Sequence, residues 1–363
     1  MFRSLTIYLR SFLTTFEFIF NSSILDQQKE IVAIVTVQCR IPQSNAICRT
    51  SLQIRVFVLS NQCHSKIRDR DRQRRELLFP QVNMIIDCKV ISYNIFEGGI
   101  DVSKPVRNEN ASNRLDAIAT FLRNSTPTVV ILTELNHFDS VRFSKFANQW
   151  NHSHSAFLTA RTGFHLGISS SFPLIELAQL KDGMHHGALL VQVDFDDQTK
   201  IGIVATHLSP FSPTTRTTEA KMITDKLKEQ DLRDWIVAGD LNSLSKRDAI
   251  QYESTMTKFT ATDKLKAKFL IPNSNSIDYT TIDHFIEQGY IDTLQESSSF
   301  RSSVPTKLDV DPMHALQMRL DYILATKELN EKLMNANVLD NETTAFLSDH
   351  YPVVASFRVD NST

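Results

Sequence analysis

Short apolar stretches alternate with amphipathic segments from about residue 88 to residue 358. The apolar stretches have the length and composition of buried strands. Two segments instead have apolar residues at helical spacing, and Ser112 or Asn113 can cap the first of them. The pattern predicts strands at 88–95, 128–132, 188–195, 201–206, 235–238, 320–325 and 352–357, and helices at 113–124 and 215–229.

The most informative strand is followed by the sequence Gly-Asp-Leu-Asn at 239–242. Residues 235–238 are continuously apolar, which is typical of a strand covered on both faces. Gly239 then allows a close backbone approach. On an extended chain Asp240 and Asn242 would project to the same side, where an anion and an amide can hold a water or a phosphate oxygen near a cation. Taken alone, an Asp and an Asn after a strand are more often a turn or a helix cap.

Polar side chains also follow or precede several other predicted strands. In layered α/β folds, ligands gather at strand ends. A set of carboxylates, amides and imidazoles at one edge suits a hard divalent ion with oxygen ligands, together with an acid or base that titrates near neutrality. These residues are Asn94, Glu134, His207, Asp240, Asn242, Asp349 and His350.

Composition and charge narrow the possible functions. The 363 residues are 42% hydrophobic and 22% charged, which is ordinary for a soluble globular protein. Residues 87–363 carry 27 Lys and Arg against 35 Asp and Glu. An acidic domain attracts a polyanion poorly unless a cation and a local basic patch offset the repulsion. The four cysteines have no CxxC or CxxH spacing, which argues against zinc and against a disulfide framework.

Residues 1–86 differ from the remainder, and we expect a poorly ordered N-terminal extension with a boundary near residue 84. The first twenty residues weakly resemble an organellar presequence, and 31–37 could form a strand. The charged run 68–76 is expected to be a solvated linker, with nuclear targeting or a nucleic-acid contact as the alternative. No apolar run is long enough for a transmembrane helix. The compartment stays open, with an intracellular location favoured.

The motifs, in order, resemble the endonuclease/exonuclease/phosphatase superfamily, which includes deoxyribonuclease I, neutral sphingomyelinases and deadenylases. The resemblance covers about 88–358. It implies an α/β fold, a four-layered sandwich with two central, mostly antiparallel sheets, within a catalytic domain at 87–363. The alternation of strands and helices alone would have favoured a doubly wound sheet. The matching residues are SYN at 92–94, Glu134, THL at 206–208, GDLN at 239–242, RLDYIL at 319–324 and SDHYPV at 348–353.

The resemblance also implies roles for individual residues. Glu134 looks like the principal Mg²⁺ ligand, assisted by Asn94 and Asp349, and Mn²⁺ is an alternative ion. His350 resembles the catalytic histidine, held and polarised by Asp321.

The remaining motif residues would act on water and phosphate. Asp240 resembles the residue that activates or orients the attacking water. Asn242 would donate a hydrogen bond to the phosphate, and His207 resembles a second histidine that contacts it. Each residue also has a plain structural explanation, such as a turn cap, a surface carboxylate or a satisfied buried histidine.

The implied function is Mg²⁺-dependent hydrolysis of a phosphodiester by direct attack of water, with a nuclease favoured. Inositol 5-phosphatases carry other residues around GDLNSL and MRLDYI, and exonuclease III-like enzymes differ at THL. A sphingomyelinase-like phospholipid phosphodiesterase, a small-molecule phosphoesterase and a non-catalytic binding protein remain alternatives. No segment indicates a stable protein partner, so we expect a monomer. Eight further histidines of the motif-bearing region, at 137, 152, 154, 165, 185, 186, 284 and 314, fit no motif, although His185 and His186 could line the cleft.

Overall fold

The structure is a computed structural model in which the chain divides into two compact units, Met1–Met84 and Ile85–Thr363. In the second unit it describes residues 86–100, 113–196, 198–295, 299–308, 311–314 and 316–359. In the first unit it describes only the backbone of four strands.

The described strands of the first unit form two antiparallel pairs. β1 (Thr6–Ser11) pairs with β2 (Thr14–Ile19), and β3 (Val35–Arg40) pairs with β4 (Ile47–Leu52). The strand predicted at 31–37 overlaps β3 only at its last three residues. Residues 31–34 and the linker expected at 68–76 lie outside the described residues. A poorly ordered extension and a targeting role stay predictions.

The second unit contains two six-stranded sheets of the same design. In each sheet one parallel pair lies at the centre, β5 with β6 or β11 with β12, and the other pairs are antiparallel. The doubly wound alternative is therefore wrong, and the mostly antiparallel sandwich is confirmed. In spatial order, one sheet contains β15 (Leu333–Val338), β16 (Val353–Val359), β5 (Ile86–Asn94), β6 (Val129–Thr133), β8 (Leu166–Ser170) and β7 (His154–Leu158), and the other contains β13 (Tyr290–Asp292), β14 (Asp321–Thr326), β12 (Trp235–Asp240), β11 (Lys200–His207), β10 (Ala188–Asp194) and β9 (Leu174–Leu180).

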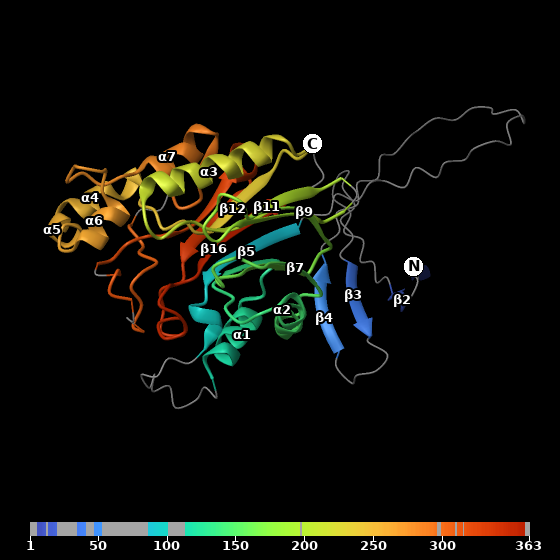
Figure 1. Cartoon of the computed structure of the whole chain (residues 1–363). Coiled ribbons are helices and arrows are strands. Elements are labelled where there is room, and N and C mark those ends of the chain that lie inside the picture. Colours follow the sequence, from blue (N-terminus) through green and yellow to red (C-terminus); the bar gives the residue numbers. More distant parts are fainter. Residues whose placement is uncertain are drawn as a thin grey trace, which may run out of the picture. The chain divides into compact units, whose positions relative to one another are not determined.

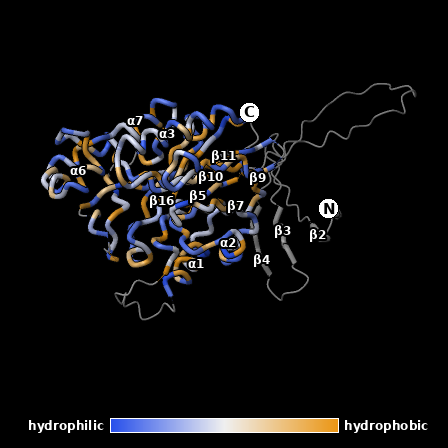
Figure 2. The backbone as a smooth tube through the Cα atoms, in the orientation of Figure 1, coloured by the Kyte–Doolittle hydropathy of each residue, from blue (hydrophilic) through white to orange (hydrophobic). Residues whose placement is uncertain are grey.

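The central strands are mainly apolar because both of their faces are covered. On β12, Ile236 and Ala238 belong to the core between the two sheets, whereas Trp235 and Val237 face the core beneath helices α3 and α7. Successive side chains of a strand point to opposite faces, so a continuous apolar run is the expected signature of this position. Figure 2 shows apolar residues concentrated along the strands.

Helices form the two outer layers (Figure 1). α1 (Arg114–Ser125) and α2 (Ser140–Ala147) cover the sheet that contains β5, and α3 (Pro213–Lys228) and α7 (Thr280–Glu287) cover the sheet that contains β12. Smaller helices pack around a further apolar cluster beside the site, and α8 follows β14. The helices around this cluster are α4 (Ala249–Glu253), α5 (Met256–Phe259) and α6 (Asp263–Phe269), and α8 spans Lys327–Asn330.

The two predicted helices begin close to where the sequence placed them. Asn113 caps α1, since its side chain accepts a hydrogen bond from the Asp116 amide at 2.7 Å. Ser212 caps α3, and Pro213 occupies the first turn, where no backbone donor is needed. Among the described residues, no helix has both the length and the apolar character that a bilayer crossing requires.

Candidate active site

The predicted site residues come together because the central pair of each sheet is parallel. Parallel strands end at the same edge, so Asn94 at the end of β5 lies beside the end of β6, which Glu134 follows. In the other sheet His207 and Asp240 are direct neighbours at the ends of β11 and β12. The antiparallel neighbours of these pairs begin at this edge, which brings Asp321 opposite Asp240.

Asp240 is the centre of the arrangement. Its Oδ2 accepts a hydrogen bond from Asn94 Nδ2 at 3.3 Å, which joins the two sheets, and lies 3.3 Å from His207 Nε2 and 3.8 Å from His350 Nε2. Gly239 makes this position possible. A Cβ atom there would lie 1.8 Å from the carbonyl oxygen of Thr206, and the φ of 143° is one that side-chain-bearing residues rarely adopt.

Asn242 reaches the site by a turn, and the expected strand alternation with Asp240 is wrong. β12 ends at Asp240, and Asn242 has a φ of 50°. Its backbone amide donates to Asp240 Oδ1 at 2.8 Å, an Asx turn, while its side-chain amide donates to the Leu208 carbonyl at 3.0 Å. The turn therefore fixes the Asp240 carboxylate and links the loops that follow β11 and β12.

The carboxylates of Glu134 and Asp349, together with the amide of Asn94, form a cluster beside Asp240 that we call the acidic group. Glu134 Oε1 accepts from Asn94 Nδ2 at 3.0 Å, and Oε2 accepts from the Glu97 amide at 3.0 Å. Burial and then the neighbouring Asp349 raise the pKa of Glu134 to about 7. Burial likewise raises the pKa of Asp349 to about 6. Two carboxylates that are costly to ionise together are stabilised when a cation lies between them.

Buried polar contacts hold the loops that carry this acidic group. Arg114 on α1 donates from Nη1 to the Ile95 carbonyl at 2.7 Å and to the Leu347 carbonyl at 2.9 Å. Ser348 Oγ donates to the Asn94 carbonyl at 2.7 Å. Glu134 has a φ of 59°, a left-handed backbone that the Gly98 amide supports by donating to its carbonyl at 2.7 Å. Such a conformation persists only where the surroundings impose it.

His350 and Asp321 form the closest charged pair of the site. His350 Nδ1 donates to Asp321 Oδ2 at 2.6 Å, and both side chains are almost completely buried. Burial opposes a charge on the imidazole, but the carboxylates of Asp321 and Asp240 outweigh it and hold the pKa of His350 well above its usual value. Its Nε2, by contrast, is directed towards the Asp240 side of the site.

His207 behaves in the opposite way. Burial, followed by repulsion from His350 and Lys268, holds its pKa well below the usual value, so His207 is neutral near pH 7. The ring of His186 stacks on it with centroids 4.2 Å apart. Burial lowers the pKa of His186 as well. The site thus contains one protonated imidazole and at least two neutral ones.

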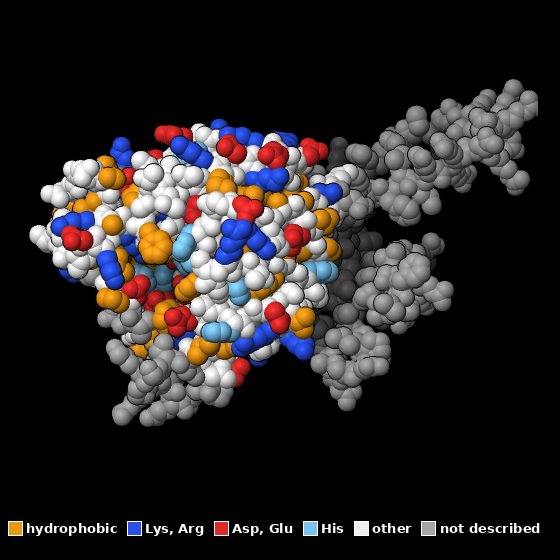
Figure 3. Space-filling model, viewed as in Figure 1, with side chains coloured by type: hydrophobic (Ala, Val, Ile, Leu, Met, Phe, Trp, Pro, Cys, Tyr) orange, Lys and Arg blue, Asp and Glu red, His pale blue; other side chains and the backbone are white. Residues whose placement is uncertain are grey.

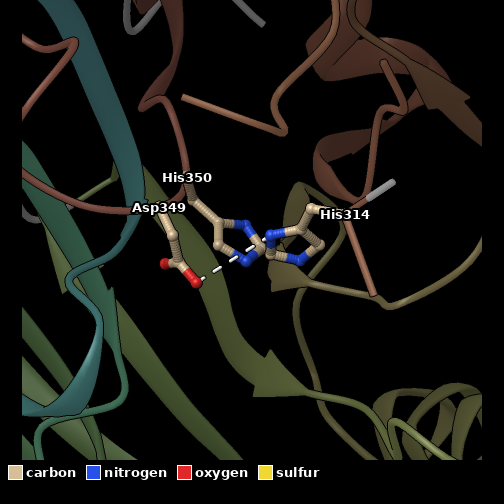
Figure 4. Close-up of side chains that lie close together, drawn as sticks. All are labelled: His314, Asp349 and His350. Atoms are coloured by element: carbon tan, nitrogen blue, oxygen red, sulfur yellow. Dashed lines mark ion pairs between the residues drawn. The ribbon is translucent and has the colours of Figure 1, made fainter. Parts of the chain in front are cut away.

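Two residues of the site were missed by the sequence reasoning. His314 is buried, its ring centroid lies 4.9 Å from that of His350, and Nδ1 lies 3.9 Å from Asp349 Oδ2 (Figure 4). Lys268, on α6, is buried, and its charge interacts with those of Asp240 and Asp349. It belongs to none of the sequence motifs, because it reaches the site from a separate helix. The sequence signal for His314 was its position three residues after Asp311, just before the RLDYIL motif.

Among the described His, Cys, Asp and Glu side chains, two groups of three present ligand atoms close enough to share a metal ion: His314, Asp349 and His350, and Asp240, Asp321 and His350. Neither is the predicted set of Asn94, Glu134 and Asp349, although Asp349 occurs in both the prediction and the first group. The carboxylates of these groups, and Glu134 and Asn94 of the predicted set, have the oxygen donors that a hard divalent ion prefers. His350 is already paired with Asp321.

Comparison with known proteins identifies the family. The model of the Endonuclease/Exonuclease/phosphatase family matches residues 91–350. The chain belongs to this family. As a member of the endonuclease/exonuclease/phosphatase family, it is a phosphoric ester hydrolase, which confirms the resemblance read from the six motifs.

Solved structures of the family share the fold. An endonuclease/exonuclease/phosphatase from Beutenbergia cavernae DSM 12333 is 18% identical with a TM-score of 0.51, over 75% of this chain and 72% of that one. An AP endonuclease from Archaeoglobus fulgidus is 16% identical with a TM-score of 0.51, over 74% and 99%. A family protein from Bacteroides thetaiotaomicron is 12% identical with a TM-score of 0.50, over 76% and 98%. A search of curated protein sequences gave no match.

Proposed function

We propose that the protein is a Mg²⁺-dependent phosphodiesterase that cleaves by direct attack of water, and that its substrate is a nucleic acid. The observation that carries the proposal is the single edge at which an acidic group, Glu134 with Asn94 and Asp349, meets a protonated His350. A phosphodiester reacts by in-line displacement, in which charge develops on both the nonbridging and the leaving oxygens. The reaction therefore needs a site for a cation and a positively charged hydrogen-bond donor close together, and this edge has residues for both.

The residues that would hold the ion are Glu134, Asn94 and Asp349. The raised pKa values of the two carboxylates fit this assignment, because burial and the neighbouring carboxylates make both groups costly to ionise and the charge on His350 offsets this only in part. When bound, a divalent ion stabilises negative charge on a phosphate oxygen.

The other residues orient water and hold protons. Asp240 would orient the attacking water, because its carboxylate is fixed by the amides of Asn94 and Asn242. His350 would keep its proton on Nδ1, towards Asp321, and present Nε2–H to the phosphate. His207, neutral and 3.3 Å from Asp240, would contact a phosphate oxygen.

The carboxylate–imidazole pair and the acidic group also argue against a binding protein without catalysis. A buried His350–Asp321 pair next to uncompensated carboxylates costs stability in a protein that needs only to bind. We also expect a monomer, and the compartment stays open.

The test is a substrate panel with the purified protein. Single- and double-stranded DNA, RNA, sphingomyelin and an inositol phosphate would each be incubated with Mg²⁺ or with EDTA. Cleavage of a nucleic acid only with Mg²⁺ is the expected result. Cleavage of sphingomyelin alone would replace the nuclease with a phospholipid phosphodiesterase, and activity that persists in EDTA would contradict the metal assignment.

The direct attack of water is tested separately. A phosphorothioate substrate of known configuration at phosphorus, hydrolysed in ¹⁸O-labelled water so that the product phosphorus is chiral, should be cleaved with inversion, because a single displacement inverts the phosphorus once. Retention of configuration would require a covalent intermediate and would contradict the mechanism.

A further inference from the structure

A row of aromatic rings runs from the site to the protein surface. His186 stacks on His207, His185 lies against His186 with centroids 4.3 Å apart, and Phe211 lies against His185 at 5.0 Å and 77°. Phe164 flanks the row, 5.2 Å from the ring of His186. The row begins at a residue that lies 3.3 Å from Asp240 and ends in solvent.

The outer end of the row is exposed although it is strongly apolar. The Phe211 side chain is 64% exposed, the most exposed of the aromatic residues among the large exposed hydrophobic side chains of the described chain. In Figure 3, histidine and acidic side chains gather in a hollow on the face shown, with hydrophobic side chains at its rim. An exposed ring with one face free is a surface on which a planar group can stack.

The loops that carry these rings are firmly held. Phe211 lies in the short loop between β11 and α3, and His185 lies in the loop before β10. Both loops are anchored to one buried carboxylate on α3: Glu219 accepts from the His185 amide at 2.6 Å and from the Ser209 amide at 2.7 Å. Pro213, buried in the first turn of α3, fixes the other end of the Phe211 loop. The outer rings are therefore preorganised.

We propose that Phe211 and His185 form a stacking platform for a nucleobase next to the scissile phosphate. This inference rests on the proposed function, since it names how a nucleic-acid strand would be held at the same site. Stacking on aromatic side chains is the usual way in which proteins bind unpaired bases, and it does not depend on base identity. The platform accordingly favours a single-stranded or unpaired segment.

A lipid surface is the other class of partner that an exposed Phe can contact, and the surroundings disfavour it. Membrane docking requires a cluster of apolar side chains. The neighbours of Phe211 in its loop are Ser209, Pro210 and Ser212, and the exposed residues beside His185 are Asp182 and Gly183. A single ring in a polar setting suits a base better than a bilayer.

Steady-state cleavage of a single-stranded oligonucleotide tests the platform in four variants. F211A and F211L remove the ring, F211W keeps it, and V141A removes exposed apolar surface from α2 as a matched control, since Val141 is 61% exposed. We expect F211A and F211L to raise KM roughly 5- to 150-fold with kcat nearly unchanged, as stacking of one base predicts. F211W and V141A should behave as the wild type.

A second substrate separates stacking from other contacts. In an otherwise identical oligonucleotide, abasic residues replace the nucleotides on both sides of the cleaved bond. The wild type and F211A should then have the same KM, because no base is present to stack. An equal loss on both substrates, or wild-type behaviour of F211L, would overturn the proposal.

Binding without turnover keeps the two proposals distinguishable. In EDTA, an oligonucleotide containing 2-aminopurine should lose fluorescence on binding to the wild type and F211W, and not on binding to F211A. No cleavage of any nucleic acid, with this quenching intact, would contradict the nuclease and leave the platform supported. Vesicles of sphingomyelin and phosphatidylcholine that bind F211L and not F211A would assign the loop to a lipid surface and overturn the platform.

Discussion

His350 and Asp321 join the two sheets of the sandwich across the site, with 2.6 Å between His350 Nδ1 and Asp321 Oδ2. Asp321 begins β14 in one sheet, and His350 precedes β16 in the other. The pair holds the imidazole in a fixed orientation and favours its charged form. The packing of the two sheets thereby determines both the position and the protonation of the residue that we assign to the phosphate.

Replacing Asp321 with Asn should keep the shape of this contact and remove its charge. We expect kcat to fall about 10²- to 10⁴-fold, the range that a positioned acid or base contributes. The pKa of His350 should also fall, because Asp240 and Asp349 would remain but the largest contribution that opposes burial would be lost. The residual activity should then decline at a lower pH than in the wild type, and a full pH profile of kcat checks this. An unchanged pH dependence would show that Asp321 does not act through His350.

Replacing His350 with Ala should abolish turnover while the protein stays folded. The side chain is buried but lies at the end of the sheets, outside the four apolar clusters. Its loss also leaves Asp321 without its partner, so we expect a modest change in the free energy of unfolding, about 1–3 kcal/mol. Denaturant unfolding and activity measured on the same preparation test both parts. Wild-type activity in the folded variant would refute the site.

The raised pKa of Glu134 predicts how the metal-free protein responds to pH. The folded protein keeps a proton on Glu134 up to about pH 7, whereas the unfolded chain releases it near 4.5. The folded state binds more protons in this window, so the free energy of unfolding falls as the pH rises through it. Partial exposure of the side chain reduces the effect, and we expect about 1–3 kcal/mol by pH 8.

The variant E134Q isolates this contribution. In EDTA, it should match the wild type near pH 5 and be the more stable protein at pH 8, as denaturant titrations at the two pH values would show. Mg²⁺ should raise the thermal midpoint of the wild type at pH 8 and have little effect on E134Q, because a ligand stabilises only the state that binds it. An equal response of both proteins would remove Glu134 from the metal site.

The sequence was sufficient for the strands β5, β6, β10, β11, β12, β14 and β16 and for the motif residues. It was insufficient for β7, β8, β9, β13 and β15, which were not predicted, and for what long-range packing decides. The apolar run at 235–238 identified β12 because burial on both faces leaves a local mark. The direction in which β14 pairs with β12 leaves no such mark, and the alternation of elements alone favoured the wrong sheet. His314 and Lys268 reach the site from segments without a motif, so only the folded chain reveals them.

The turn at Asn242 shows a second limit. Alternation along a strand was the natural expectation for Asp240 and Asn242, but it holds only while the strand continues. The strand ends at Asp240 because the next residues must leave the sheet beside Leu208, whose carbonyl accepts from Asn242. Asn242 still lies beside Asp240, as expected, but a turn and not strand alternation brings it there.

Gly239 should tolerate no side chain. An added Cβ would lie 1.8 Å from the Thr206 carbonyl oxygen, in the parallel ladder that aligns His207 with Asp240. Gly289 is the matched control, since it also has a positive φ, 90°, but nothing within 4 Å. We expect G289A to cost about 1–2 kcal/mol from its backbone conformation alone and G239A to cost clearly more, or to prevent folding. Equal unfolding midpoints for the two variants would contradict the close approach.

Removal of residues 1–84 should leave activity intact. The second unit begins at Ile85, and its first strand pairs with β16 from Ile86 opposite Val359 to Ser92 opposite Val353. Among the residues whose side chains the structure describes, this unit forms four apolar clusters of its own. A protein that starts at Ile85 should therefore keep the kcat/KM of the full chain on the substrate that the panel identifies. A folded but inactive truncated protein would mean that the first unit contributes to substrate binding or to catalysis.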